Sequence, residues 1–433
     1  MKEIINIVCM GCSKNLVDAE HLAKQLDSNN FEIHFDYNKD DASIVIINTC
    51  GFIGDAKEES IEVILNFAEA RKNGSIKKLF VMGCLSERYR EELKVEMPEV
   101  DKFYGKFDWK EIIREIKDGA SEPIENDRII STPSHFAYLK ISEGCNKRCS
   151  YCAIPVITGE HKSIPMEDLV EEAQNLQKKG VKELLVIAQD LSYYGVDLYG
   201  EYKLAELLNR LSQIEGIEWI RIHYAYPSDF PMNVIEEMAK NPKICHYLDI
   251  ALQHSSDKML KIMRRGINRE KTLELISNIR SLVPDICLRT TFLVGHPGET
   301  EEDFDDLVEF AKEIQFDRVG VFPYSFEENT HTAENYVDDI PQEVKDERVE
   351  VLMNVQENIL FEKNEKLVGK KFKVIVDSED SEYYIARSQY DSPEVDLEIF
   401  IDKSEKLKIG DFYIVNINKV ETFNLYASLD SIV

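Results

Sequence analysis

Apolar runs and amphipathic stretches alternate along the first 125 residues of the chain. Short apolar runs at residues 4–8, 44–47 and 79–82 predict buried strands. Residues 15–26 and 55–71 repeat apolar side chains with helical spacing, and a third helix is expected from about residue 86. Strands that alternate with helices predict a parallel sheet, so we expect residues 1–125 to form an α/β domain.

A second α/β series follows a polar stretch at residues 118–133, which is typical of a linker. Candidate strands lie at residues 137–141, 183–188, 219–223, 247–250, 287–294 and 318–323. Helical stretches separate them at residues 166–179, 203–214, 269–282 and 301–314. Six such units are too few for a closed eight-stranded barrel. We therefore expect residues 131–365 to form an open, partial TIM barrel with its active site at the carboxyl ends of the strands.

The pattern changes once more near the end of the chain. Residues 341–366 predict one long helix, because apolar residues recur at three- and four-residue steps. Short β runs follow at residues 372–376, 383–387, 395–401, 412–418 and 423–428. Five short strands in so short a segment predict a small β-barrel of the oligonucleotide-binding (OB) kind over residues 366–433. The expected fold class is therefore α/β with a small carboxyl-terminal β-barrel.

Composition narrows the classes of partner. The chain of 433 residues carries 52 Lys and Arg against 81 Asp and Glu, a formal net charge of −29. Such an acidic chain has no general attraction for polyphosphate, so nucleic-acid binding is not expected. The predicted barrel is itself acidic, because residues 370–433 hold eight Lys or Arg and thirteen Asp or Glu. A barrel with a charge of −5 is a poor surface for RNA.

Membrane insertion and export are not expected either. No apolar run approaches the roughly 18–20 residues that span a bilayer. The charged residues Lys2, Glu3, Asp18 and Glu20 exclude a secretory signal near the start. The nine cysteines are an odd number, which argues against a disulfide framework. We expect a cytoplasmic protein with reduced thiols.

Three cysteines lie close together in the sequence, Cys145, Cys149 and Cys152, with the spacing C-x3-C-x2-C. Structural zinc prefers a closed set of four ligands. Three thiolates instead suit a [4Fe–4S] cluster whose fourth iron stays open to another molecule. The segment follows the first strand of the second series, so it is expected at the catalytic edge of the partial barrel.

Three further cysteines, Cys12, Cys50 and Cys84, each lie just beyond a strand of the first series. Loops after the carboxyl ends of parallel strands share one edge of the sheet, so we expect these thiols to converge in a second three-thiolate site. The alternative is three buried structural thiols, since free cysteine is among the most buried residue types. Core cysteines would lie within strands or on helix faces rather than three times at the same strand end. Cys9, at the end of the first strand, is interpreted as structural.

The segments around both triplets resemble the radical-SAM methylthiotransferase family. Residues 11–15 (GCSKN), 48–52 (NTCGF) and 82–84 (MGC) resemble its amino-terminal domain. The C-x3-C-x2-C segment, with Tyr151 before its last cysteine, resembles the radical-SAM motif, and the final 65 residues resemble a TRAM domain. The resemblance implies two [4Fe–4S] clusters, S-adenosylmethionine (SAM) as radical source and methyl donor, and insertion of a methylthio group at a C–H bond. The cofactors would carry this chemistry while the protein orients them.

Three segments are similar to the RimO branch of this family: residues 11–20 (GCSKNLVDAE), 188–195 (AQDLSYYG) and 252–257 (LQHSSD). That branch modifies the β-carbon of a conserved aspartate in small-subunit ribosomal protein twelve. An acidic enzyme suits such a substrate, because ribosomal proteins are typically basic. The alternatives are a MiaB-type enzyme acting on a tRNA adenosine and a non-catalytic iron–sulfur electron-transfer protein. A reducing partner such as flavodoxin or ferredoxin and a sulfur donor are also expected.

The candidate SAM contacts are Tyr151, Gln189, Gln253, Arg289 and Thr291. Gln189 and Gln253 end their strands at the presumed catalytic edge. Arg289 and Thr291 lie within one strand, where alternation directs only some side chains inward. The glycines of residues 295–300 (GHPGET) fit either a backbone approach to SAM or a plain turn. We assign no catalytic residue beyond the cluster ligands, and interpret His223, His254 and His296 as structural and Cys245 and Cys287 as core.

Overall fold

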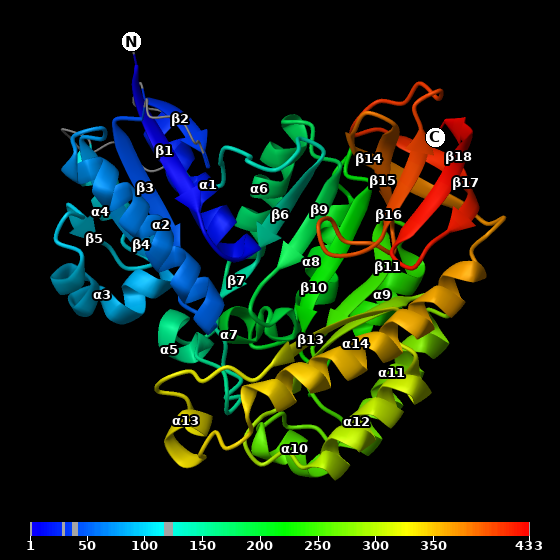
Figure 1. Ribbon diagram of the computed structural model, residues 1–433. Coiled ribbons are helices and arrows are strands. Elements are labelled where there is room, and N and C mark those ends of the chain that lie inside the picture. Colours follow the sequence, from blue (N-terminus) through cyan, green and yellow to red (C-terminus); the bar gives the residue numbers. More distant parts are fainter. Residues whose placement is uncertain (1, 28–30, 37–41, 117–123, 433) are drawn as a thin grey trace.

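The computed structural model describes residues 2–27, 31–36, 42–116 and 124–432. Figure 1 shows three main sheets, with the amino-terminal sheet on the left, the central sheet in the middle and the carboxyl-terminal barrel at the upper right. Of the predicted linker, residues 124–133 contain no helix or strand, and residues 118–123 lie outside the described residues.

The amino-terminal sheet is parallel, with strand order β2–β1–β3–β4–β5. Its strands are β1 (Glu3–Cys9), β2 (Phe31–Phe35), β3 (Ile44–Thr49), β4 (Lys78–Gly83) and β5 (Lys102–Phe103). Along β3, Val45 and Ile47 pack towards α2 (Gly54–Lys72) and α3 (Cys84–Glu96). Ile44 and Ile46 pack on the other face with α1 (Ser13–Asp27) and α4 (Trp109–Ile116). The predicted parallel α/β sheet is confirmed, whereas β2, β5 and α4 were not predicted.

The central sheet has six parallel strands in chain order, β6–β9–β10–β11–β12–β13. They are β6 (Phe136–Lys140), β9 (Glu183–Ile187), β10 (Trp219–Ala225), β11 (Ile244–Ile250), β12 (Cys287–Val294) and β13 (Arg318–Pro323). The edge strands β6 and β13 do not pair with each other, so the sheet stays open and the predicted partial barrel is confirmed.

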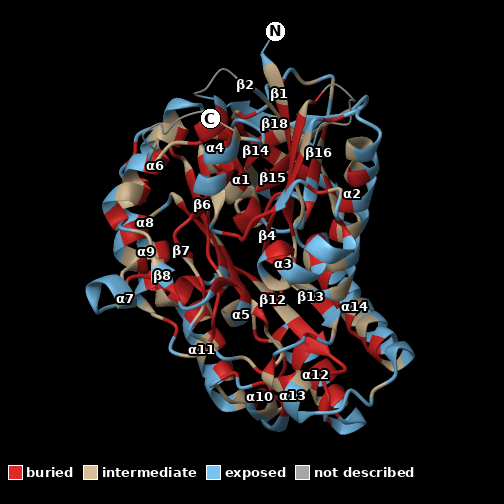
Figure 2. Ribbon diagram, turned by 90° about the vertical axis from the view of Figure 1, so that its left-hand side faces the viewer, coloured by how far each residue is buried: buried red, intermediate tan, exposed pale blue. Residues whose placement is uncertain are grey.

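Helices cover the outer face of the central sheet and bury a large apolar core against it. They are α6 (Met166–Lys178), α8 (Leu204–Ser212), α9 (Asn233–Lys240), α11 (Arg269–Leu282), α12 (Glu301–Ile314) and α14 (Gln342–Glu365). The remaining elements are short: β7 (Ser142–Glu143), β8 (Lys162–Ser163), α5 (Ile154–Thr158), η1 (Leu191–Tyr193), α7 (Val196–Tyr199), α10 (Asp257–Ile262) and α13 (His331–Asn335). Figure 2 shows the buried residues concentrated along the strands.

The carboxyl-terminal strands close into the five-stranded barrel that the sequence predicts, in the order β14–β15–β16–β18–β17. They are β14 (Lys371–Glu379), β15 (Tyr383–Ser388), β16 (Glu398–Asp402), β17 (Phe412–Val420) and β18 (Asn424–Ile432). Ile375 and Phe412 of this barrel pack with Trp219, Cys245 and Cys287 near the amino ends of the central strands. The barrel therefore covers the edge opposite the predicted active site.

No helix among the described residues has both the length and the apolar character that crossing a membrane requires.

Candidate active site

Cys12, Cys50 and Cys84 lie at the carboxyl edge of the amino-terminal sheet, where Asn15 joins the loops that carry them. Asn15 Nδ2 donates to the carbonyl oxygen of Thr49 at 3.0 Å, and Cys84 Sγ lies 3.6 Å from Asn15 Oδ1. A Cβ atom placed on Gly11 would lie 3.2 Å from Cys50 Sγ. The structure thus brings the three segments together at one edge, although they are far apart in the sequence.

The thiols of this second triplet influence one another electrostatically. Burial raises the pKa of Cys84 to about 12; Lys106 opposes this shift, and Cys12 and Cys50 add to it. Burial also raises the pKa of Cys50, again with a contribution from Cys12. A metal centre would relieve this cost, because thiolates are its ligands.

Two glycines allow the loops of Cys50 and Cys84 to pack backbone against backbone. A Cβ on Gly51 would lie 2.5 Å from the carbonyl carbon of Cys84, and a Cβ on Gly83 would lie 2.6 Å from the backbone nitrogen of Thr49. Gly83 also has φ +98°, which favours glycine. Since this residue makes the whole turn, α3 begins at Cys84 itself, earlier than the predicted start near residue 86.

Cys145, Cys149 and Cys152 lie in the loop between β7 and α5, at the carboxyl edge of the central sheet. Cys149 Sγ accepts a hydrogen bond from Arg265 Nη1 at 3.0 Å and lies 3.7 Å from the Tyr226 hydroxyl. Burial raises the pKa of Cys145 to about 12, and Asp190 adds to the shift. This first triplet is therefore surrounded by polar groups from several barrel loops.

Arg265 and Tyr226 were not identified from the sequence. Tyr226 follows the last residue of β10, and its hydroxyl donates to the carbonyl oxygen of Arg265 at 2.7 Å. Burial acts against the charge of Arg265, but Tyr151 and Cys149 raise its pKa overall, so it remains a cation beside the thiols. No local motif marks either residue, because only the fold brings them to the cysteine loop.

The two triplets adjoin each other where the amino-terminal sheet meets the central sheet. Cys84 packs in a buried cluster with Ala153, the residue after Cys152, and with Ile157 of α5. Nearby, Lys106 Nζ pairs with Glu143 Oε1 at 2.9 Å. Burial acts to raise the pKa of Glu143, but Lys140 and Lys106 lower it to about 2, so the carboxylate stays ionised. Both apolar and ionic contacts therefore hold the amino-terminal sheet against the central sheet.

The five candidate SAM contacts, Tyr151, Gln189, Gln253, Arg289 and Thr291, have different neighbours in the structure. Tyr151 accepts a hydrogen bond from Arg265 Nη1 at 3.3 Å, and Gln189 Nε2 donates to Glu143. Gln253 N donates to the carbonyl oxygen of Thr291 at 2.8 Å, so these two residues are neighbours. Arg289 lies nearer the amino end of β12 and pairs with Asp396 of the carboxyl-terminal barrel at 2.6 Å. The structure thus joins Tyr151 to the first triplet through Arg265, places Gln189 against Glu143, and directs Arg289 towards the carboxyl-terminal barrel.

The donor sets fit iron–sulfur clusters. Each iron of a [4Fe–4S] cluster takes one protein ligand, so three thiols hold three irons and need not meet at one ion. Among the residues that the structure describes, no group of three or more His, Cys, Asp or Glu side chains is arranged for a single metal ion. Buried polar atoms without a hydrogen-bond partner lie near the first triplet on Gln189, Asp190 and Arg265. Buried polar atoms without a hydrogen-bond partner are rare in native proteins. These three could form hydrogen bonds with the polar groups of SAM when it is bound.

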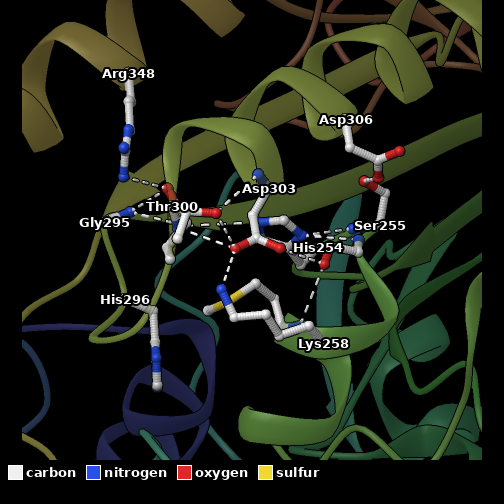
Figure 3. A network of polar contacts seen from close by, with 12 residues as sticks. His254, Ser255, Lys258, Gly295, His296, Thr300, Asp303, Asp306 and Arg348 are labelled. Carbon is white, nitrogen blue, oxygen red and sulfur yellow. Dashed lines mark hydrogen bonds and ion pairs between the residues drawn. The ribbon is translucent and has the colours of Figure 1, made fainter.

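A polar network fixes the loops that follow β11 and β12 (Figure 3). Glu299 accepts hydrogen bonds from Gly295 N at 3.0 Å and from Arg348 Nη1 at 2.7 Å. Gly295 has φ +72°, as a turn after β12 requires, and a Cβ on it would lie 2.3 Å from Lys345 Cγ. The backbone N–H of Ser255 donates to His254 Nδ1 at 2.9 Å.

His296 is held in the same region by Thr332, whose hydroxyl oxygen lies 2.9 Å from Nε2. Burial lowers the pKa of His296 to about 4, so the ring is neutral near pH 7. Its ring also meets that of Tyr151 edge to face. His296 therefore supports the cysteine loop through packing, in agreement with a structural role.

Known families match three consecutive parts of the chain. Residues 4–105 match the uncharacterized protein family UPF0004, residues 139–311 match the Radical SAM superfamily, and residues 368–429 match the TRAM domain. The three matches fall on the three main sheets described above.

Curated relatives match almost the whole chain. A protein of Phocaeicola vulgatus named ribosomal protein uS12 methylthiotransferase RimO is 53% identical over 429 residues, which cover 99% of each chain. The protein of the same name from Bacteroides thetaiotaomicron is 53% identical over 426 residues, 98% of each chain.

Among solved structures, the fold is similar to that of TsrM from Kitasatospora setae, a radical S-adenosylmethionine methyltransferase with cobalamin and a [4Fe-4S] cluster bound. The TM-score is 0.57 at 14% identity, and the match covers 77% of this chain and 74% of that chain. This likeness concerns the fold alone.

Proposed function

The chain belongs to the RimO family of ribosomal protein uS12 methylthiotransferases. From this premise we propose which of its residues hold the two clusters, which bind SAM and which hold the domains together. It is a radical-SAM enzyme that inserts a methylthio group into ribosomal protein uS12. We place the modification on the β-carbon of a conserved aspartate. The observation that carries this proposal is the pair of cysteine triplets that adjoin through Cys84, Ala153 and Ile157.

The enzyme uses two [4Fe–4S] clusters and SAM. We propose that Cys145, Cys149 and Cys152 hold the cluster that binds SAM. The second cluster is assigned to Cys12, Cys50 and Cys84. When bound, these groups supply a carbon radical that removes hydrogen from the substrate, together with the sulfur and the methyl group of the product.

Side chains of the barrel edge orient SAM and exclude water. We assign Tyr151, Gln189, Gln253 and Thr291 to SAM, because they lie at this edge and Gln189 offers an unpartnered buried oxygen. Arg265 keeps its positive charge beside Cys149 and balances the anionic thiolates. Arg289 is assigned to docking of the carboxyl-terminal barrel through Asp396 instead of to SAM.

Three domains are proposed: residues 1–125 hold the second cluster, residues 131–365 hold SAM, and residues 366–433 form the TRAM barrel. A net charge of −29 would attract a basic ribosomal protein. A reductant such as flavodoxin or ferredoxin and a separate sulfur donor complete the proposed set of partners. We place the reaction in the cytoplasm, where uS12 is made.

The substrate assignment is tested by a direct comparison. The anaerobically reconstituted protein is incubated with SAM, sulfide, a reductant and either uS12 or unmodified tRNA. We expect mass spectrometry to find a methylthio group on a uS12 peptide that contains aspartate, and none on tRNA. Modification of tRNA alone would favour the MiaB-type function. Reduction that yields no 5′-deoxyadenosine with either substrate would favour a simple electron carrier.

The metal content provides an independent check. Two cubane clusters predict about eight irons and as many labile sulfides per chain in anaerobically purified protein. Chelation of the iron should remove both clusters and lower the melting temperature, because bound metal stabilises the folded state. A content of about four irons would contradict the second cluster.

A further inference from the structure

Lys14 lies between the two cysteine triplets. It is the second residue of α1 and follows Cys12 by two positions. Its Nζ lies 3.1 Å from the centre of the Tyr224 ring, at the carboxyl end of β10. Two residues further along, the Tyr226 hydroxyl approaches Cys149 Sγ. The Lys14 ammonium therefore lies in the region that joins the second cluster site to the SAM site.

The charge of Lys14 is buried without an ion-pair partner. The residue is only 8% exposed, yet no carboxylate of the described residues lies within 4.0 Å of its Nζ. Buried lysines are usually paired, because removing an ammonium from water is costly. Lys106 and Lys140, the other buried lysines at this boundary, both pair with Glu143. Among these three lysines, Lys14 alone lacks an ion-pair partner in the part of the chain that the structure describes, and its contact is the Tyr224 ring.

Two titratable groups, Asp249 and His223, lie near enough to Lys14 to be affected by its charge. Asp249 is near enough for Lys14 to influence it, but burial is the largest effect and raises the pKa of Asp249 to about 6. His223 is neutral, since burial lowers its pKa well below the usual value, with Arg221 and Lys14 adding to the effect. The Ser13 hydroxyl, beside Lys14 in the first turn of α1, is buried without a hydrogen-bond partner. Asp249 thus acts on Lys14 at longer range without forming a direct ion pair, so a substrate carboxylate would be the first direct anionic partner of Lys14 among the described residues.

The backbone beneath Lys14 is also unusual. Tyr224 has φ +65°, a conformation that side-chain-bearing residues rarely adopt. The pairing of β10 with β11 shifts register between Ile222 and Ala225, as in a β-bulge. Bulges and strained residues cluster at functional sites, where they redirect a side chain. Here the bulge presents the Tyr224 ring to the ammonium of Lys14.

We propose that Lys14, supported by the Tyr224 ring, binds the side-chain carboxylate of the aspartate that is modified. This inference rests on the proposed function, which places the reacting carbon between the SAM site and the second cluster site. The carboxylate is bonded to that carbon, so it must lie in the same region. A desolvated ammonium makes a strong charge-assisted hydrogen bond to a carboxylate, and an asparagine amide would leave the charge unpaired.

The test compares binding of two substrates by three forms of the holoenzyme. The substrates are uS12 with aspartate or with asparagine at the modified position. The proteins are the wild type, Lys14→Met and Lys78→Met. Lys78 is a matched control, because its Nζ also lies over an aromatic ring, that of Phe80, but at the amino end of β4. Affinities are measured with SAM present, and 5′-deoxyadenosine is measured without uS12.

We expect the wild type and Lys78→Met to bind the aspartate form roughly tenfold to a hundredfold more tightly than the asparagine form. Lys14→Met should bind both forms equally and should still cleave SAM without uS12. Lys14→Arg, which keeps the charge, should restore part of the preference.

Retention of the full preference by Lys14→Met would overturn the inference. If that variant kept the preference but lost SAM cleavage, the carboxylate bound by Lys14 would be that of SAM. A wild type that leaves uS12 unmodified would instead refute the proposed function. A misfolded variant would also lose the preference, so measurable binding of both substrates and intact SAM cleavage by Lys14→Met are required to exclude a folding defect.

Discussion

Cys149→Ala should abolish 5′-deoxyadenosine formation, whereas Cys50→Ala should spare it and abolish the methylthio product. Cys149 belongs to the triplet beside the barrel loops, and Arg265 donates to its sulfur. Cys50 belongs to the other triplet, where its segment packs against Gly11. Because each variant removes one proposed ligand from a different cluster, the two halves of the reaction should fail separately. Both products are measured by chromatography and mass spectrometry after single-turnover incubation with SAM and uS12.

Cys9→Ala is the matched control for Cys50→Ala. Cys9 ends β1 three positions before Cys12 and packs with the apolar core on the α1 side of the sheet. Removing its sulfur should leave both products and the iron content unchanged, with only a small loss of stability. A complete reaction by Cys50→Ala would contradict the second cluster site, and the same would follow if Cys9→Ala lost half the iron.

Much of the fold follows from the hydrophobic pattern. The six strands of the central sheet were predicted because each is an apolar run between amphipathic helices. The open sheet was predicted because six units are too few to close an eight-stranded barrel. The same reasoning placed Cys12, Cys50 and Cys84 at one edge before any contact was known. β5 escaped prediction because two residues carry no periodicity.

The surroundings of the clusters could not be predicted in this way. Arg265 contacts Cys149, and Lys14 contacts Tyr224. The residues of each pair are far apart in the sequence, and only the packing of the folded chain brings them together. Arg289 shows the opposite case, since its strand was predicted correctly but its side chain pairs with Asp396. The spacing of apolar residues predicts which face of a helix or strand is buried. It does not predict which residue a long polar side chain on that element will contact.

The position of the second cluster depends on contacts between the domains. Glu327, in the loop after β13, is 2% exposed and pairs with Arg88 Nη1 of α3 at 2.6 Å. The carboxylate also accepts a hydrogen bond from Ile53 N at 3.0 Å, and Arg88 donates to the carbonyl oxygen of Gly51 at 2.8 Å. Ile53 has φ +72°, so this loop needs external support. Glu327 thus binds the segment that follows Cys50 to the loop after β13 of the central sheet.

Glu327→Ala should therefore separate SAM cleavage from sulfur insertion. Loss of the carboxylate leaves Arg88 buried without its partner, which typically costs about 3–5 kcal/mol of stability. The first triplet is untouched, so 5′-deoxyadenosine should still form. The second cluster would lose its alignment, and the yield of methylthio product per 5′-deoxyadenosine should fall by up to about a hundredfold. Both yields and the melting temperature are measured on the reconstituted protein.

Glu328→Ala is the matched control, because Glu328 is the next residue and contacts Tyr89 of the same helix from an exposed position at 3.1 Å. An exposed contact of this kind contributes little, so this variant should keep the wild-type ratio of products. Glu327→Gln keeps an acceptor for Ile53 N and should lie between the wild type and Glu327→Ala. If Glu327→Ala lost stability but kept the wild-type ratio, the ion pair would serve folding alone. A changed ratio with both clusters still present would instead show that this contact sets the alignment of the two sites.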